Sequence, residues 1–110
     1  MSELANRELI PPHGGENSPL KDPELSNIYD LLGNEWLIVS GHQLEKEYKF
    51  SDFQSALDFT NKVGQLAEEV DHHPEICLTW GKAKITIWTH SIGGLSEADF
   101  VFAAKADQFV

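Results

Sequence analysis

Two adjacent histidines stand in the run from Glu68 to Pro74, which reads Glu-Glu-Val-Asp-His-His-Pro. A third histidine, His90, and a carboxylate, Asp99, follow further along the chain. Histidine has an unperturbed pKa near neutral pH, so it can take up or release a proton under physiological conditions. Several imidazoles held close together would therefore suit general acid–base catalysis.

The paired histidines are expected at a bend in the backbone. Pro74 cannot continue a helix, and it biases the preceding residue, His73, toward an extended conformation. A structural explanation also exists, because cationic side chains at a helix C-terminus complement the helix dipole. That explanation accounts for one histidine more readily than for two, so the pattern favours a functional pair at His72 and His73.

The other candidates have stronger structural explanations. Taken alone, His90 is a residue at a strand end, and Asp99 is the acidic member of a capping box that Ser96 opens. Glu68 stands one helical turn before His72, so it could hydrogen-bond that imidazole or be one more solvated acid. The pattern leaves both interpretations of Glu68 open.

Metal binding and thiol chemistry are both disfavoured by the sequence. Neighbours such as His72 and His73 cannot easily ligate one ion, and the chain has no Cys-x-x-Cys or His-x-x-x-His pair. Cys77 alternates with apolar residues in a predicted strand, where nothing indicates a lowered thiol pKa. We therefore expect no metal, no bound cofactor and no cysteine nucleophile.

The composition predicts one acidic globular domain. The 110 residues are 41% hydrophobic and 24% charged, as in ordinary folded proteins, and the formal net charge of −10 disfavours binding to nucleic acid. No apolar run approaches the ~18 residues of a membrane span. Cys77 is the single cysteine, which is typical of a reducing compartment. We expect a cytoplasmic protein that binds neither nucleic acid nor membrane.

The chain is expected to divide into an N-terminal arm and one domain. Residues 1–21 contain paired prolines and paired glycines with few apolar side chains, a composition typical of irregular structure. His13 lies in this arm and is interpreted as a solvated tail residue. The domain is expected to span residues 22–110.

Local signals predict three helices and two hairpins in that domain. The first helix is expected to begin with Asp22 as N-cap and Pro23 at its first position, and the second with a capping box of Ser51 and Gln54. The third is expected to open at Ser96. The predicted helices are 23–32, 52–70 and 97–109, and the predicted strands are 36–39, 43–50, 76–80 and 84–90. The buried face of the second helix is predicted at Phe53, Ala56, Leu57, Thr60, Val63, Ala67 and Val70.

This order of elements has no long crossover between paired strands. It predicts an α+β fold, in which a four-stranded antiparallel sheet has three helices packed on one face. Trp88 is expected on the other face, where an exposed tryptophan indicates a subunit interface.

One spaced pattern joins the candidate residues: Glu68-x3-His72-His73-Pro74-x5-Trp80-x9-His90-x8-Asp99. It resembles the signature of the pterin-4a-carbinolamine dehydratase family. Residues 50–69 are similar to that family's central helix, and residues 89–100 to its second active-site segment. The likeness extends over about residues 25–107, and it implies the same α+β fold and assembly as a homodimer or homotetramer.

The resemblance implies dehydration of a 4a-hydroxytetrahydropterin to the quinonoid dihydropterin, which recycles the cofactor of aromatic amino acid hydroxylases. An acid must protonate the leaving hydroxyl while N5 loses its proton, and imidazoles can do either. The reaction needs no metal or redox cofactor. The implied acid–base residues are His72, His73 and His90. The implied pterin-contacting residues are Glu68, Pro74, Thr89, Ser91, Ile92, Asp99 and Trp36, the last as a floor of the pocket.

The same resemblance implies a rival role, because some family members are protein-binding factors. They act in dimerisation of a transcription factor or in Rubisco assembly. Such a role would use a helix surface or a sheet edge and would not require the histidines. The complete histidine set in this chain favours an enzyme.

Overall fold

The computed structural model describes residues 3–9, 19–33 and 35–110, so His13 lies outside the described residues. The elements follow the predicted order of helix, two strands, helix, two strands and helix. They are α1 (Glu24–Leu32), β1 (Leu37–Val39), β2 (Gln43–Lys49), α2 (Phe53–Val70), β3 (Glu75–Thr79), β4 (Lys82–Ile87), a 3₁₀ turn (His90–Ile92) and α3 (Glu97–Asp107).

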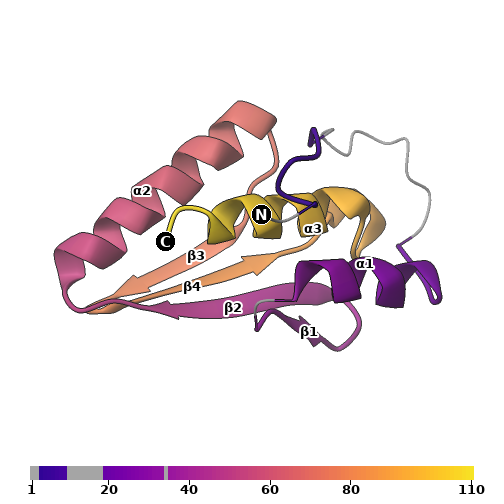
Figure 1. Ribbon diagram of the computed structural model, residues 1–110, viewed down its shortest axis with the longest axis horizontal. Coiled ribbons are helices and arrows are strands. Elements are labelled where there is room, and N and C mark those ends of the chain that lie inside the picture. Colours follow the sequence, from indigo (N-terminus) through magenta and orange to yellow (C-terminus); the bar gives the residue numbers. More distant parts are fainter. Residues whose placement is uncertain (1–2, 10–18, 34) are drawn as a thin grey trace.

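The strands form one antiparallel sheet in the order β1-β2-β4-β3. The two hairpins join through β2 and β4, which pair from Leu44 opposite Ile87 to Lys49 opposite Lys82. The helices lie on one side of this sheet (Figure 1). The predicted α+β arrangement is therefore confirmed.

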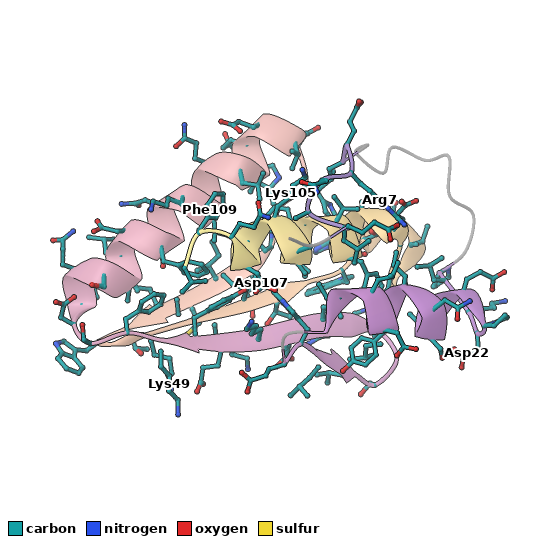
Figure 2. All side chains as sticks on the ribbon, in the orientation of Figure 1. Arg7, Asp22, Lys49, Lys105, Asp107 and Phe109 are labelled. Carbon is teal, nitrogen blue, oxygen red and sulfur yellow. The ribbon has the colours of Figure 1, made fainter. Side chains whose placement is uncertain are left out.

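The core is centred on α3, which has eight buried residues, whereas α2 has five and α1 has two. Residues 3–9 lie across α3, where Leu4 and Leu9 are buried and Lys105 Nζ donates a 2.9 Å hydrogen bond to the Ala5 carbonyl (Figure 2). The sequence pattern predicts burial of Leu95, Phe102, Ala103, Ala106 and Phe109 in this region. Ala98, Asp99, Phe100, Val101 and Ala104 are buried as well, so that prediction was incomplete.

The N-cap of the second helix lies one residue later in the chain than predicted. Asp52 is the N-cap, with Oδ1 accepting a 2.8 Å hydrogen bond from the Ser55 backbone N–H, so the predicted Ser51 cap is wrong. A carboxylate at this place also meets the positive end of the helix. The hydrogen bonds from Ser55 lower the pKa of Asp52.

The buried face of α2 is also rotated from the predicted one. Phe59 and Leu66 are buried, whereas Phe53, at the first turn, is 42% exposed. Phe59 packs against Tyr48 and Phe50 of the second strand region, with ring centroids 4.4 and 5.3 Å apart. Aromatic contacts between α2 and the β2 region therefore favour the side of α2 that carries Phe59 as the buried one.

Most other element ends differ from the prediction by one to three residues, and α3 ends at Asp107 rather than at residue 109. The N-cap of α1 is Pro23 rather than Asp22, although Asp22 Oδ1 still accepts a 3.2 Å hydrogen bond from the Ser26 N–H. The turn of the second hairpin precedes Lys82, which already pairs with Lys49. The last strand ends at Ile87, short of the predicted His90.

A partly buried polar centre at the C-terminal end of α3 joins that helix to the sheet. Asp107 accepts hydrogen bonds from Trp36 Nε1 at 3.0 Å, Lys46 Nζ at 2.9 Å and Tyr48 Oη at 2.5 Å (Figure 2). Burial, reinforced by the Asp107 carboxylate, holds the pKa of the Tyr48 phenol far above its ordinary value. Lys46 thus points inward with the apolar residues of β2, as the alternation of that strand predicts.

We expect Asp107→Ala to lower the free energy of unfolding by about 2–4 kcal/mol, because it leaves the Lys46 charge and two buried donors unpaired. Urea unfolding of wild type and variant measures the difference. Asp30→Ala, an exposed substitution on α1, is the control and should change stability by less than about 0.5 kcal/mol. Equal effects of the two substitutions would contradict this account of the centre.

Tyr48 also predicts a loss of stability in alkali. The folded protein keeps the phenol proton, whereas the unfolded chain releases it around the ordinary pKa of 10.0. Stability present below this pH is therefore lost as the pH rises above it, by up to about 1.4 kcal/mol per pH unit. Urea unfolding between pH 10 and 11 should show a steeper fall for wild type than for Tyr48→Phe, and parallel slopes would refute the assignment.

Candidate functional site

The histidine pair lies where α2 ends. Asp71 caps the helix in the left-handed conformation, with φ of 53°, and His72 N–H donates back to the Ala67 carbonyl at 3.2 Å. Such a cap reverses the direction of the backbone. Pro74 then keeps the chain from re-entering a helix. The bend predicted from the sequence is therefore present, and it sends the two imidazoles to different surroundings.

His72 turns inward, where it meets Asp99 in the first turn of α3. Its Nε2 lies 2.6 Å from Asp99 Oδ1, and the carboxylate is fully buried. Asp99 Oδ2 accepts hydrogen bonds from Thr89 Oγ1 and from Ser96 N–H, both at 2.8 Å. Ser96 and Asp99 also form the predicted capping box of α3. One carboxylate thus joins α2, α3 and the segment after β4.

This network fixes the proton on the His72 ring. An ionised carboxylate can only accept hydrogen bonds, so His72 Nε2 donates to Asp99. In the neutral ring, Nδ1 is then the nitrogen with a free lone pair. Hydrogen bonds to both oxygens of Asp99, in a site closed to solvent, hold the ring in a fixed orientation.

His73 turns outward and pairs with Glu68. Its Nε2 lies 2.5 Å from Glu68 Oε2, with side chains 54% and 78% exposed. The sequence left open whether Glu68 would hydrogen-bond His72. In the structure Glu68 contacts His73 instead. The left-handed residue Asp71 explains this, because it removes His72 from the helical face on which Glu68 lies.

His90 is stacked on a tryptophan. Its ring lies parallel to that of Trp88, with centroids 4.4 Å apart and an interplanar angle of 18°, and His42 approaches Trp88 at 5.2 Å. The neighbouring residue Thr89 is bonded to Asp99, which places His90 next in the chain to the His72 network. The ring contacts of His90 are nevertheless with Trp88, not with the other two imidazoles.

The other predicted contact residues are divided between two places. Ser91, exposed, and Ile92, half-buried, lie beside His90 in the 3₁₀ turn, and half-buried Pro74 follows His73. Trp36 is bonded to Asp107 at the far end of α3. Asp99 and Asp107 are eight residues apart, or about 12 Å along a helix. The structure therefore brings the other predicted site residues to one end of α3 and Trp36 to the opposite end.

Three members of this region, Ser96, Trp88 and His42, were missed as site residues. Ser96 was predicted as a helix cap, and the capping box itself signalled that it would touch Asp99. The alternation of the last strand predicted Trp88 on the same face as His90 and exposed to solvent. The strand ends before both residues, and Trp88 is half-buried against the core, so the prediction of an exposed tryptophan was wrong although the two rings stack. His42 gave no such signal, because the β1–β2 turn meets Trp88 through tertiary pairing.

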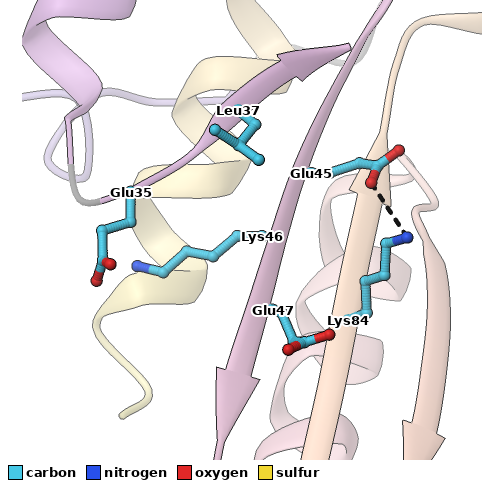
Figure 3. A pocket seen from close by; sticks show the side chains of 6 residues that line it. All are labelled: Glu35, Leu37, Glu45, Lys46, Glu47 and Lys84. Atoms are coloured by element: carbon cyan, nitrogen blue, oxygen red, sulfur yellow. Dashed lines mark ion pairs between the residues drawn. The ribbon is translucent and has the colours of Figure 1, made fainter.

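The described residues contain no group of three or more His, Cys, Asp or Glu side chains able to hold a metal ion. None of the helices in that part of the chain is long and apolar enough to span a membrane. A hollow of about 350 Å³ lies along β1, β2 and β4, away from the histidines (Figure 3). Its lining includes Glu45 and Lys84, an ion pair at 3.1 Å, and no histidine, so it lacks a group that titrates near neutral pH.

Two solved structures with a similar fold are named for pterin dehydratases. A transcriptional coactivator/pterin dehydratase from Brucella melitensis superimposes with a TM-score of 0.77 at 30% identity, over 84% of this chain and 98% of its own. A pterin dehydratase-like protein identified as a RuBisCO assembly factor in the alpha-carboxysome has a TM-score of 0.58 at 25% identity, over 68% of this chain and 86% of its own.

Sequence comparison identifies the family. The model described as pterin 4 alpha carbinolamine dehydratase matches residues 18–109. Proteins provisionally named pterin-4-alpha-carbinolamine dehydratase from Rubrobacter xylanophilus and Alkaliphilus metalliredigens are 52% and 49% identical, over 98% of this chain and 99% and 96% of theirs. The chain belongs to the pterin-4-alpha-carbinolamine dehydratase family, which confirms the resemblance found in the sequence.

We expect Asp99→Asn to change the tautomer of His72. The amide oxygen can serve Ser96 and Thr89, but its NH2 group then faces His72 Nε2, which must become an acceptor. The ring proton should move to Nδ1, and stability should fall by about 1–3 kcal/mol. Imidazole ¹⁵N NMR and urea unfolding measure both effects. Asp58→Asn, on the exposed side of α2, should change neither, and an unchanged Nε2–H signal in Asp99→Asn would contradict the proton assignment.

Proposed function

We propose that this protein dehydrates a 4a-hydroxytetrahydropterin to the quinonoid dihydropterin. The observation that carries the proposal is the pair of histidine–carboxylate contacts at the end of α2, His72 with Asp99 and His73 with Glu68. One pair is buried and one is open to solvent. Such a pair of environments supports different acid–base duties for two neighbouring imidazoles.

In the proposed reaction the C4a–O bond breaks, the hydroxyl leaves as water, N5 loses its proton and a C4a=N5 double bond forms. One imidazolium supplies a proton to the leaving oxygen and a neutral imidazole accepts the N5 proton. His73 and His90 are exposed and can meet a ligand through a ring face or edge. His72 can accept a proton at Nδ1 while Asp99 stabilises the imidazolium that results.

The substrate is proposed to lie between the end of α2 and the turn at His90. Pro74 would form an apolar wall beside His73, and Thr89, Ser91 and Ile92 would contact the pterin through backbone and side chain. Glu68 and Asp99 would orient the imidazoles. Trp36 was expected to floor this pocket, and its hydrogen bond to Asp107 supports a structural duty for it in the isolated chain.

We also propose that the protein acts in the cytoplasm as a homodimer or homotetramer. Exposed apolar side chains support an assembly, since Leu37 is 62% and Trp80 72% exposed. Cys77 is a free, exposed thiol, which is consistent with a reducing compartment.

A protein-binding role is the second candidate. It is supported by the structural similarity to the RuBisCO assembly factor, which is lower than that to the Brucella protein in both identity and coverage. An assembly factor needs a surface and not a set of titratable groups. Dehydratase activity of the purified chain, absent a partner, separates the two candidates, and an inactive chain that binds a protein partner would favour the second.

We expect His73→Ala to lower kcat/KM for a 4a-carbinolamine pterin about 10²- to 10⁴-fold, because it removes a general acid–base group. Stopped-flow absorbance, which follows formation of the quinonoid product, measures the rate. Because His73 is exposed, its removal should not unfold the protein, and thermal unfolding of the variant separates a loss of activity from a loss of structure. Wild-type turnover in His73→Ala would exclude His73 from the chemistry.

Two adjacent glutamates offer a matched control. Glu68→Gln removes the carboxylate that contacts His73, so activity should fall and its pH profile should shift. Glu69→Gln makes the same change one residue away, beside Lys62 and Phe109 on another part of the surface, and should leave both unchanged. Equal behaviour of the two variants would contradict a role for the Glu68–His73 contact.

A further inference from the structure

The segment that carries His90 is a loop closed at its neck. Thr89 N–H donates to the Gly94 carbonyl at 2.8 Å, and Gly94 N–H donates back at 3.4 Å. Residues 90–93 lie between these bonds and include the proposed contacts Ser91 and Ile92. We call residues 89–95 the His90 loop. Whatever holds its neck also sets the position of the His90 ring.

A distant part of the chain covers that neck. Leu20 N–H donates a 2.8 Å hydrogen bond to the Leu95 carbonyl. The ring of Pro19 lies so close to Gly94 that a Cβ built there would stand 2.7 Å from the Pro19 Cβ and Cγ. Real Cβ atoms essentially never stand so close to a non-bonded carbon atom, and a proline ring cannot bend away as a flexible side chain can. Pro19 and Leu20 are called the strap from here on.

Space, not backbone conformation, explains the glycine at position 94. Gly93 has φ of 63°, in the left-handed region where glycine is favoured, but Gly94 is not among the glycines with positive φ. Gly94 is buried under the strap. The missing side chain is thus what allows Pro19 to pack on the neck of the loop.

The strap is anchored at its C-terminal side. Leu25 N–H donates to the Lys21 carbonyl at 3.0 Å, so the strap leads directly into α1. On the same side of the molecule, Arg7 pairs with Glu97 of α3 at 2.8 Å (Figure 2). The strap therefore connects the His90 loop to α1, which takes no part in the proposed chemistry.

We propose that Pro19 and Leu20 are positioning residues that hold the His90 loop in place for the reaction. This inference rests on the proposed dehydratase function. The strap fixes the neck, the neck fixes Thr89 against Asp99, and the loop beyond it fixes His90 on Trp88. A shift of the neck therefore changes His90 and the partner of His72 together, and a misplacement of about 1 Å in a catalytic group can lower the rate on the order of 10²-fold.

Gly94→Ala tests the strap, because the new methyl group must displace Pro19. We expect kcat/KM to fall about tenfold or more, with a raised KM, while thermal unfolding stays cooperative. Gly64→Ala is the matched control, since Gly64 lies in α2 with nothing within 4 Å of its built Cβ. It should keep the wild-type kinetics. Wild-type kinetics in Gly94→Ala would overturn the proposal.

A double-mutant cycle separates the strap from a general packing defect. Pro19→Gly removes the ring that the methyl group meets, so adding Gly94→Ala to Pro19→Gly should cause no further loss. If the methyl group is as harmful without the Pro19 ring as with it, the proposal is wrong. Pro19→Gly removes no core side chain, so it tests the proposal even if Gly94→Ala folds poorly. Wild-type kinetics in Pro19→Gly would also overturn the proposal.

Hydrogen–deuterium exchange gives a readout that does not depend on turnover. In Pro19→Gly, the amides of residues 89–95 should exchange at least several-fold faster than in wild type, with no change in the first half of α2. If Pro19→Gly exchanges faster but the wild-type protein has no dehydratase activity, the dehydratase proposal fails and the structural role of the strap remains. Unchanged exchange with active wild type would mean that the strap fails and the dehydratase proposal remains.

Discussion

A single buried carboxylate, that of Asp99, holds together the parts of this protein that could do chemistry. Its two oxygens receive the imidazole of His72, the hydroxyl of Thr89 and the backbone N–H of Ser96. An unpaired charge at a fully buried position would be strongly destabilising. The end of α2, the loop after β4 and the start of α3 are therefore obliged to meet at this point, and the site exists because the fold must satisfy this group.

The sequence predicted those features of the fold that local chemistry decides. The Ser96–Asp99 capping box, the end of α1 at Gly33 and the alternation of β2 all depend on neighbours within a few residues. Burial of α3 on all sides could not be predicted, because residues 3–9 cover it from a remote part of the chain. The rotation of α2 followed from the aromatic contacts of Phe59, which likewise form only after the sheet is in place.

The candidate site divides in the same way. The bend at Pro74 and the proximity of the Trp88 and His90 rings followed from residue types and spacing. The partner of Glu68 did not, since a left-handed residue between Glu68 and His72 decided it. The contact of Pro19 with Gly94 could not be predicted either. A glycine can be required by a positive φ or by lack of space, and the sequence does not distinguish the two reasons.

The two histidines also differ in what would become of them if the chemistry were no longer needed. His72 and Asp99 are part of the packed interior, so replacing them would weaken the fold itself. His73 and Glu68 face water and support nothing beneath them. In a relative without the proposed activity, the outward pair would be free to change while the inward pair persisted. Under the proposed function, the outward pair would therefore be the better marker of activity.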